Sequence, residues 1–213
     1  MPRKAASPKA RREASKVNEP KVVVGLGNPG QEYEGTRHNA GFMAVELLST
    51  KLRRFTGWRR EGALLRGEGR AGRHGITVAK PQTYMNRSGQ ALRDLIREGW
   101  TPSEILVVLD DVYLPLGTLR LRAAGGTGGH QGLESILAEV GTAEFPRLRI
   151  GVGPAPRSSD LPEYVLERFL EEERAKLPEA LEGAASAAFD AAASGLTQAM
   201  NRWNRFGLDP VEE

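Results

Sequence analysis

Short apolar runs that alternate with longer segments of helical periodicity are the feature that most constrains the fold of this chain. The runs KVVVGL, ITVAK, ILVVLDD and RLRIGVG are rich in β-branched and aliphatic residues, as buried strands are. The segment after the first run places its apolar residues on one helical stripe, formed by Phe42, Val45, Leu48 and Leu52. Strands that alternate with helices predict an α/β fold with one central sheet, and 213 residues allow one domain.

The remaining segments extend this order of elements. TLRLRA alternates apolar and charged residues, which is typical of a half-exposed strand. Polar strand-like segments are expected near 58–66, helices at about 89–98 and 132–140, and further helices in the Ala- and Glu-rich part after Leu161.

Composition excludes several classes of protein. The chain has no cysteine, which rules out disulfides, thiolate nucleophiles and Cys-ligated zinc and fits a reducing compartment. No apolar run approaches the roughly 20 residues of a membrane-spanning helix. Because the first 20 residues also lack the apolar core of a signal peptide, we expect a cytoplasmic protein without membrane association.

Charge is segregated along the chain. Residues 1–20 carry six Lys or Arg against two Glu, residues 21–155 carry 18 against 13 acidic residues, and residues 156–213 carry six against 12. Residues 1–20 show no hydrophobic periodicity, so we expect a disordered basic extension followed by one folded domain at 21–213. The basic middle favours a polyanionic partner, with an Arg-rich solvated surface as the alternative.

A histidine and a carboxylate stand at the ends of separate elements. His38 precedes Asn39, a plausible helix N-cap, and the positive helix end would favour the neutral imidazole that a general base requires. Asp110 ends a buried apolar strand, where a carboxylate could hold a ring N–H of His38. The alternatives are a surface loop histidine and an ordinary turn or cap aspartate.

Carboxamides complete this predicted hydrolytic site. Residues 25–30, GLGNPG, match the dinucleotide fingerprint, but the helix starts late, near Ala40, and the expected acidic partner is missing. We therefore expect a sharp glycine turn that presents the Asn28 amide to a cavity. Asn86 could position water or an oxyanion, or simply cap a helix. Ser88 lacks the nucleophile elbow of serine esterases.

An arginine pair precedes a glycine-rich turn. Arg120 and Arg122 alternate with leucines, so both should project from one strand face, before the turn GGTGGHQG that opens onto a helix. The pair could clamp a backbone phosphate at the helix N-terminus, or consist of solvated surface arginines. His130 is expected to organise this loop. Three scattered histidines without HExxH spacing predict no metal centre.

The motifs GLGNPGQEYEGTRHNAGF, KPQTYMNRSG, LDDVYLPLGTLRLRAAGGTGGHQGL and FPRLRIGVG, in this order, resemble those of the bacterial peptidyl-tRNA hydrolase family from about Lys21 to the C-terminus. The resemblance implies a mixed central sheet flanked by helices in a monomeric cytoplasmic enzyme. It implies hydrolysis of the ester joining a peptide to the tRNA 3′ end, which recycles tRNA during translation, with no metal or cofactor.

The resemblance also implies roles for single residues. His38 matches the catalytic base, Asp110 its supporting carboxylate, Asn28 the asparagine that helps distinguish N-blocked from free aminoacyl esters, and Asn86 one that binds substrate and positions water. Further positions expected to contact peptide or tRNA are Tyr33, Tyr84, Gln131, Arg120, Arg122 and Arg149.

Two positions depart from the family pattern. Gln131 stands where the family usually has asparagine, and Tyr113 replaces a residue that is commonly acidic. The longer Gln131 side chain displaces its amide by roughly 1 Å, a shift that can weaken catalysis. Two alternatives stay open: a non-catalytic RNA-binding relative of the family, and a serine esterase.

Overall fold

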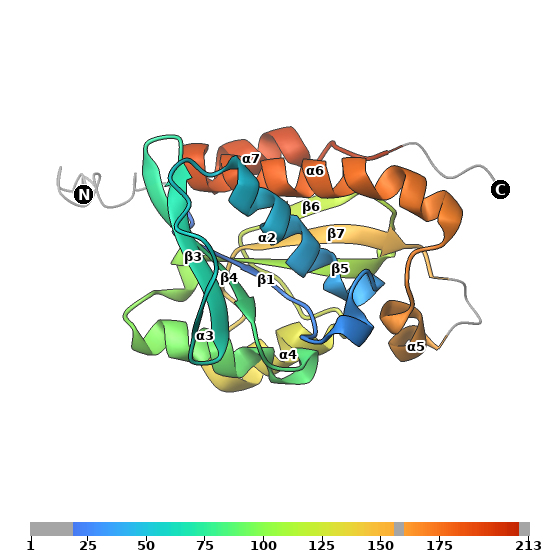
Figure 1. Ribbon diagram of the computed structural model, residues 1–213, viewed down its shortest axis with the longest axis horizontal. Coiled ribbons are helices and arrows are strands. Elements are labelled where there is room, and N and C mark those ends of the chain that lie inside the picture. Colours follow the sequence, from blue (N-terminus) through green and yellow to red (C-terminus); the bar gives the residue numbers. More distant parts are fainter. Residues whose placement is uncertain (1–18, 156–159, 209–213) are drawn as a thin grey trace, which may run out of the picture.

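The computed structural model describes residues 19–155 and 160–208, so almost all of the expected basic extension at 1–20 lies outside the described residues. Within them, seven strands form one sheet in the order β2-β3-β4-β1-β5-β7-β6 (Figure 1). The strands are β1 (Val22–Gly25), β2 (Arg59–Glu61), β3 (Leu64–Ala71), β4 (His74–Pro81), β5 (Ile105–Pro115), β6 (Leu119–Arg122) and β7 (Arg147–Gly153).

Helices connect and follow these strands. The α-helices are α2 (Ala40–Lys51), α3 (Ser88–Arg97), α4 (Gln131–Val140), α5 (Leu161–Leu166), α6 (Glu171–Ser194) and α7 (Leu196–Trp203). Short 3₁₀ turns are η1 (Gln31–Tyr33), η2 (Arg37–Asn39), η3 (Met85–Arg87) and η4 (Pro102–Glu104). None of the described helices is both long and apolar enough to cross a membrane.

The sheet is mixed. Its four central strands β4, β1, β5 and β7 are parallel, whereas β2 and β3 on one side and β6 on the other pair antiparallel with their neighbours. The carboxyl ends of the parallel strands therefore meet at one edge of the sheet, where ligands bind in folds of this kind. The turns that follow β1 and β4, together with the carboxyl half of β5, lie at this edge.

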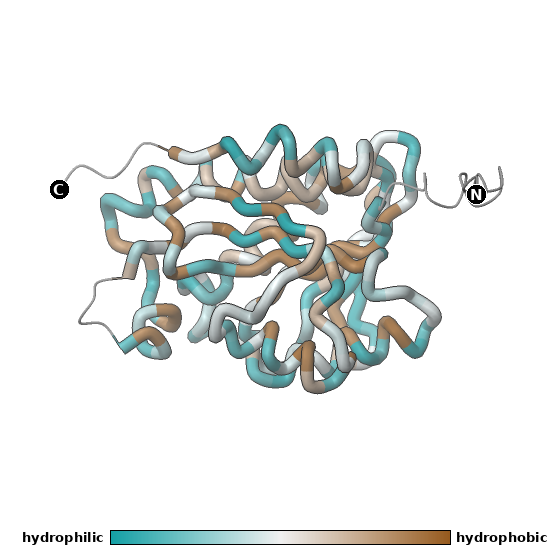
Figure 2. The backbone as a smooth tube through the Cα atoms, turned by 180° about the vertical axis from the view of Figure 1, so that it is seen from behind, coloured by the Kyte–Doolittle hydropathy of each residue, from teal (hydrophilic) through white to brown (hydrophobic). Residues whose placement is uncertain are grey.

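Two apolar layers cover the two faces of the sheet. Val23 packs on one face among residues of α2, α6 and α7, including Ala184 and Ala188, while Val22 and Val24 face the side of α3 and α4. Figure 2 shows the corresponding alternation of hydrophobic and hydrophilic colour along the flanking helices. This arrangement confirms the expected single-domain α/β fold with a mixed central sheet flanked by helices.

The glycines after β1 serve close packing more than sharp turning. A Cβ atom on Gly41, in the first turn of α2, would lie 2.5 Å from the Leu26 carbonyl oxygen and nearer still to that of Val108. A Cβ atom on Gly25 would in turn meet the Gly41 carbonyl. Of the three glycines in GLGNPG, only Gly30 has a positive φ, of 120°. The bare glycine backbones thus let α2 approach β1 and β5 closely.

We predict that Gly41→Ala destabilises the fold by about 1–3 kcal/mol, because overpacking against fixed backbone atoms outweighs the ~1 kcal/mol that alanine gains over glycine in a helix. Urea unfolding followed by tryptophan fluorescence measures this. The control is Gly75→Ala on β4, where an added Cβ meets nothing within 4 Å. Equal stability of the two variants would contradict the close-packing explanation.

Candidate active site

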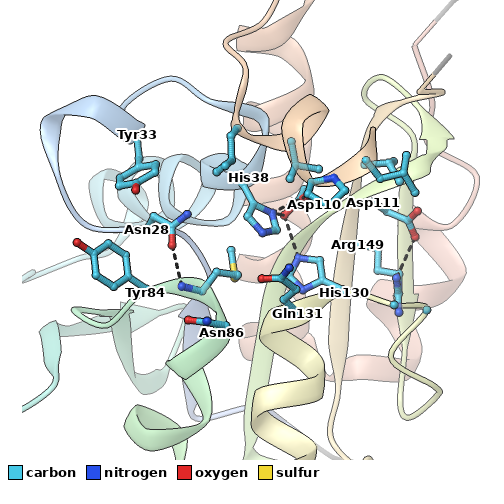
Figure 3. A pocket seen from close by; sticks show the side chains of 18 of the residues that line it. Asn28, Tyr33, His38, Tyr84, Asn86, Asp110, Asp111, His130, Gln131 and Arg149 are labelled. Atoms are coloured by element: carbon cyan, nitrogen blue, oxygen red, sulfur yellow. Dashed lines mark hydrogen bonds and ion pairs between the residues drawn. The ribbon is translucent and has the colours of Figure 1, made fainter. Parts of the chain in front are cut away.

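One cavity of about 700 Å³ lies at the carboxyl edge of the parallel strands. Its walls come from the turns after β1 and β4, from η2, from β5, from the loop before α4 and from α5 (Figure 3). It brings together most of the residues expected to carry function, namely Asn28, Tyr33, His38, Tyr84, Asn86, Asp110, Gln131 and Arg149. Arg120 and Arg122 on β6 do not line it.

His38 and Asp110 form a hydrogen-bonded pair in this cavity. Asp110 follows Leu106 and Val108 along the alternation of β5, on the face covered by α2, and His38 lies in η2 directly before α2. The His38 Nδ1 atom is 3.0 Å from both carboxylate oxygens, and both residues are buried. Because a carboxylate only accepts, Nδ1 carries the proton and Nε2 of the neutral ring keeps its lone pair.

His130 shares the same carboxylate, a contact that the sequence did not predict. The backbone N–H of Gly132 donates to His130 Nδ1 at 3.1 Å, so the ring caps α4 and its proton resides on Nε2. That Nε2 atom lies 3.0 Å from Asp110 Oδ1, and the His38 and His130 ring centroids are 5.0 Å apart. His130 organises the loop as expected, and it also joins the loop to the His38–Asp110 pair.

Asp110 remains a carboxylate in this setting. Its complete burial by itself would raise its pKa, but the imidazoles of His38 and His130 outweigh burial and hold the pKa well below its usual range. Nitrogen and oxygen atoms of these three residues lie within 4.8 Å of one another, a spacing that a metal ion could use. In this structure both ring nitrogens that face Asp110 carry a proton and donate it to the carboxylate in a hydrogen bond. We therefore assign the cluster as a hydrogen-bonded network.

Asn39 fixes the turn that carries Asn28. Its Oδ1 accepts from the Asn28 backbone N–H at 2.8 Å and its Nδ2 donates to the Asn28 carbonyl at 3.0 Å. Asn39 therefore occupies the N-cap position of α2 without a side-chain cap, because its amide is used by the neighbouring turn. The Asn28 Oδ1 atom accepts from Met85 N–H at 2.7 Å, which leaves the Asn28 amide N–H₂ as a donor to the cavity.

The other side-chain amides of the cavity are free. Asn86 in η3 and Gln131 at the start of α4 are exposed, and neither amide has a hydrogen-bond partner among the described residues. Tyr33 and Tyr84 lie together on the wall formed by the turns after β1 and β4, with ring centroids 6.2 Å apart and an edge-on arrangement. These groups are available to a ligand.

Arg149 is engaged with the protein itself. Its guanidinium lies 3.1 Å from an Asp111 oxygen and 3.0 Å from the carbonyls of Gly126 and Thr127. The buried Arg147, two residues earlier on β7, donates to the carbonyls of Gly125 and Gly126. These arginines hold the glycine-rich loop along β7. A phosphate was expected at the N-terminus of α4, and one of the N–H groups there, that of Gly132, is already used by His130.

Ser88 is unsuited to attack a substrate. It is fully buried at the start of α3, and its Oγ atom contacts the Met85 sulfur at 3.9 Å. It has no histidine or carboxylate partner in the described chain.

The chain is similar to one protein family along nearly its whole length. A family model described as peptidyl-tRNA hydrolase matches residues 22–210. Peptidyl-tRNA hydrolase from Chloroflexus aggregans is 46% identical over 187 residues, covering 86% of this chain and 98% of that protein. Peptidyl-tRNA hydrolase from Moorella thermoacetica is 47% identical over 185 residues, covering 86% of this chain and 97% of that protein.

Solved structures agree with the sequence comparisons. The crystal structure of peptidyl-tRNA hydrolase from Acinetobacter baumannii at 1.00 Å resolution superposes with a TM-score of 0.82 at 34% identity, covering 90% of this chain and 98% of that chain. An Arg119Gln mutant of the same enzyme superposes equally well, at 36% identity.

We predict that Asp110→Asn lowers the free energy of unfolding by about 1–3 kcal/mol at pH 7, because a charged acceptor of two hydrogen bonds is lost. Because the pKa of Asp110 is depressed in the folded protein, its negative charge stabilises the fold at pH values above the pKa of about 3.9 that an unfolded aspartate has. This stabilisation is lost as the pH falls below that value. The difference between wild type and variant should therefore narrow by about 1 kcal/mol per pH unit below about pH 4.

Urea unfolding at pH 7, 5, 3.5 and 3 measures this difference. The control is Asp94→Asn on α3, whose partly exposed carboxylate pairs, among the described residues, only with the exposed Arg97 and should change stability little at any pH. A difference that stays constant down to pH 3 would show that Asp110 is not held as a carboxylate by its two neighbours.

Proposed function

The chain belongs to the peptidyl-tRNA hydrolase family, and from this premise we propose that it hydrolyses, as a carboxylic ester hydrolase, the ester joining a peptide to the tRNA 3′ end, with His38 as general base. Membership makes it an enzyme acting on peptidyl-tRNA, in support of translation. One observation carries the catalytic assignment. The His38 ring is fixed through Nδ1 by Asp110, and its other nitrogen is left to accept a proton at a cavity lined by side-chain amides.

The reaction follows from this geometry. His38 Nε2 takes a proton from water as the water oxygen attacks the ester carbonyl, and Asp110 stabilises the imidazolium that forms. When the tetrahedral intermediate collapses, the bond from the carbonyl carbon to the tRNA 3′ oxygen breaks and the imidazolium returns the proton to that oxygen. The amides of Asn28, Asn86 and Gln131 position the water and the carbonyl oxygen.

Asn28 supplies a physical basis for selecting N-blocked esters. Because Met85 N–H fixes its oxygen, Asn28 offers the cavity an N–H₂ donor. The carbonyl of a peptide or N-acetyl group accepts such a hydrogen bond, whereas the ammonium of a free aminoacyl ester only donates. With a free aminoacyl ester, the Asn28 N–H₂ would face an ammonium and lose its hydrogen-bond acceptor, which strongly disfavours binding of that ester.

We assign tRNA binding to the outward-facing arginines of the last strand of the sheet, β6. Arg120 and Arg122 are exposed on one face of β6, while the alternating Leu119 and Leu121 are buried. Two guanidinium groups on one face suit the phosphates of an acceptor stem. We assign Arg149 to holding the glycine-rich loop, since its guanidinium is already paired with Asp111.

The proposal includes a monomeric enzyme that acts in the cytoplasm, where translation supplies the substrate. A non-catalytic RNA-binding role is not favoured, because the relatives reported above are named as hydrolases. A serine esterase is disfavoured because Ser88 is buried without a base.

We predict that the purified protein releases N-acetyl-amino acid from N-acetyl-aminoacyl-tRNA, with chelator present, and leaves the unblocked aminoacyl-tRNA intact. His38→Ala should lower kcat/KM by about 10²–10⁴-fold, the usual contribution of a general base, with tRNA affinity nearly unchanged. The matched control is His74→Ala on β4, outside the cavity, which should keep wild-type turnover. Near-normal hydrolysis by the His38 variant would remove the general-base assignment.

We also predict that Arg120→Gln combined with Arg122→Gln weakens tRNA binding and reduces the slope of log affinity against log salt by about 2, roughly one per lost phosphate contact. Filter binding at several salt concentrations measures the slope. The control is Arg59→Gln with Arg60→Gln on β2, an exposed pair at the opposite edge of the sheet. If both double variants keep the wild-type slope, the phosphate contacts lie elsewhere.

A further inference from the structure

The short helix α5 supplies an apolar wall to the cavity. Its pocket-lining residues are Leu161, Pro162, Val165 and Leu166. Leu166 is 45% exposed, so part of this wall is accessible to a ligand. The helix sequence LPEYVL contains one acidic residue and no Lys or Arg, which makes it unsuited to phosphate and suited to apolar groups.

Among the described residues, two contacts anchor α5 to the rest of the molecule. Figure 1 shows α5 apart from the helices that cover the two faces of the sheet, and among the described elements it packs chiefly on η2. A second anchor is the Tyr164 hydroxyl, which donates to the Val152 carbonyl at 2.9 Å. Burial raises the pKa of Tyr164, so this hydroxyl stays protonated and remains a donor.

Arg37 makes the connection between α5 and η2. Its side chain is 1% exposed, and its guanidinium carbon lies 4.2 Å from the centre of the Tyr164 ring. Nη1 is 3.3 Å from both the Tyr164 carbonyl and a Glu167 oxygen, and Nη2 is 2.8 Å from a Glu173 oxygen. One guanidinium thus holds the helix α5, the segment after it and the first turn of α6.

Backbone contacts reinforce the same junction. The Arg37 N–H donates to the Glu167 carbonyl at 3.0 Å, and Thr36 pairs with Arg168 in an isolated bridge. Arg37 and His38 are neighbours in the same 3₁₀ turn. Arg37 contacts this junction through both its side chain and its backbone, so we expect it to contribute to the position of the apolar wall relative to the His38 ring. It lies outside the hydrogen-bonded network of the ring itself.

We propose that Arg37 is a positioning residue that fixes the α5 wall relative to His38, and that this wall binds apolar side chains of the peptide in peptidyl-tRNA. The inference rests on the proposed function and adds a specificity determinant to it. An apolar contact of this kind discriminates between side chains by about 10-fold or more. The contact acts on substrate binding, because the base and its carboxylate are held by other atoms.

Steady-state hydrolysis of N-acetyl-phenylalanyl-tRNA and N-acetyl-glycyl-tRNA tests the proposal. Wild type should show the higher kcat/KM with the phenylalanyl substrate. Arg37→Met keeps an apolar stem beside Tyr164. This variant should raise KM for the phenylalanyl substrate about 5- to 10-fold and change its kcat by less than about twofold. Both KM and kcat for the glycyl substrate should change by less than about twofold. Equal discrimination in the two proteins, or a fall in kcat alike for both substrates, would overturn the proposal.

Amide hydrogen exchange tests the anchoring step without any turnover. Residues 160–170 should exchange faster in Arg37→Met than in wild type, and unchanged exchange there would overturn the anchoring. The control is Arg66→Met on β3, an arginine that also has two carboxylate partners, Glu61 and Glu98, and lies outside the cavity. That variant should leave both the exchange of α5 and the discrimination between substrates as in wild type.

Milder variants keep the test decisive if Arg37→Met does not fold. Glu173→Gln weakens one partner of the guanidinium, and Arg37→Lys keeps its charge but loses the forked donors. Each of these two variants should reduce the discrimination between the phenylalanyl and glycyl substrates and speed amide exchange at residues 160–170, by less than Arg37→Met does. If both variants show wild-type discrimination and wild-type exchange, the proposal is overturned. A wild-type protein that hydrolyses neither substrate refutes the proposed function, while the exchange experiment still decides the role of Arg37.

Discussion

A buried carboxylate that accepts from two imidazoles is the interaction on which the site depends. Asp110 is buried, so its oxygens need hydrogen-bond donors from the protein, and His38 and His130 supply them. In doing so it fixes which nitrogen of each ring carries the proton. The same carboxylate also joins β5, the turn before α2 and the loop before α4. One charged group therefore supports both the chemistry of the site and the packing of these three segments.

The fold was predictable from sequence because its elements are locally consistent. The alternation of Leu119 to Arg122, the stripe on α2 and the buried runs of β1, β5 and β7 each follow a short-range period that packing then preserves. Convergence of His38, Asp110, Asn28 and Asn86 at one cavity was also predictable, because the carboxyl edge of a parallel sheet gathers the turns that carry most of them.

The rest depended on contacts between residues far apart in the chain. The bond of His130 to Asp110 spans 20 residues, and the bonds of Arg37 to Glu167 and Glu173 span more than 100. Asn39 has the sequence signature of a cap, but the neighbouring turn offers its amide two backbone partners and so changes its role. A local pattern states what a side chain can do, and only the assembled fold decides which partner it meets.

The three residues of η2 each serve a different part of the molecule: Arg37 the helix α5, His38 the carboxylate on β5, and Asn39 the turn after β1. Successive side chains on a 3₁₀ turn point about 120° apart, so their directions are set by their spacing in the chain. Inserting or deleting a single residue between Thr36 and Ala40 would rotate all three away from their partners at once. Insertions and deletions should therefore be excluded from this stretch during evolution. A change of length at the exposed hairpin tip between β2 and β3, around Gly62, would disturb none of these three contacts.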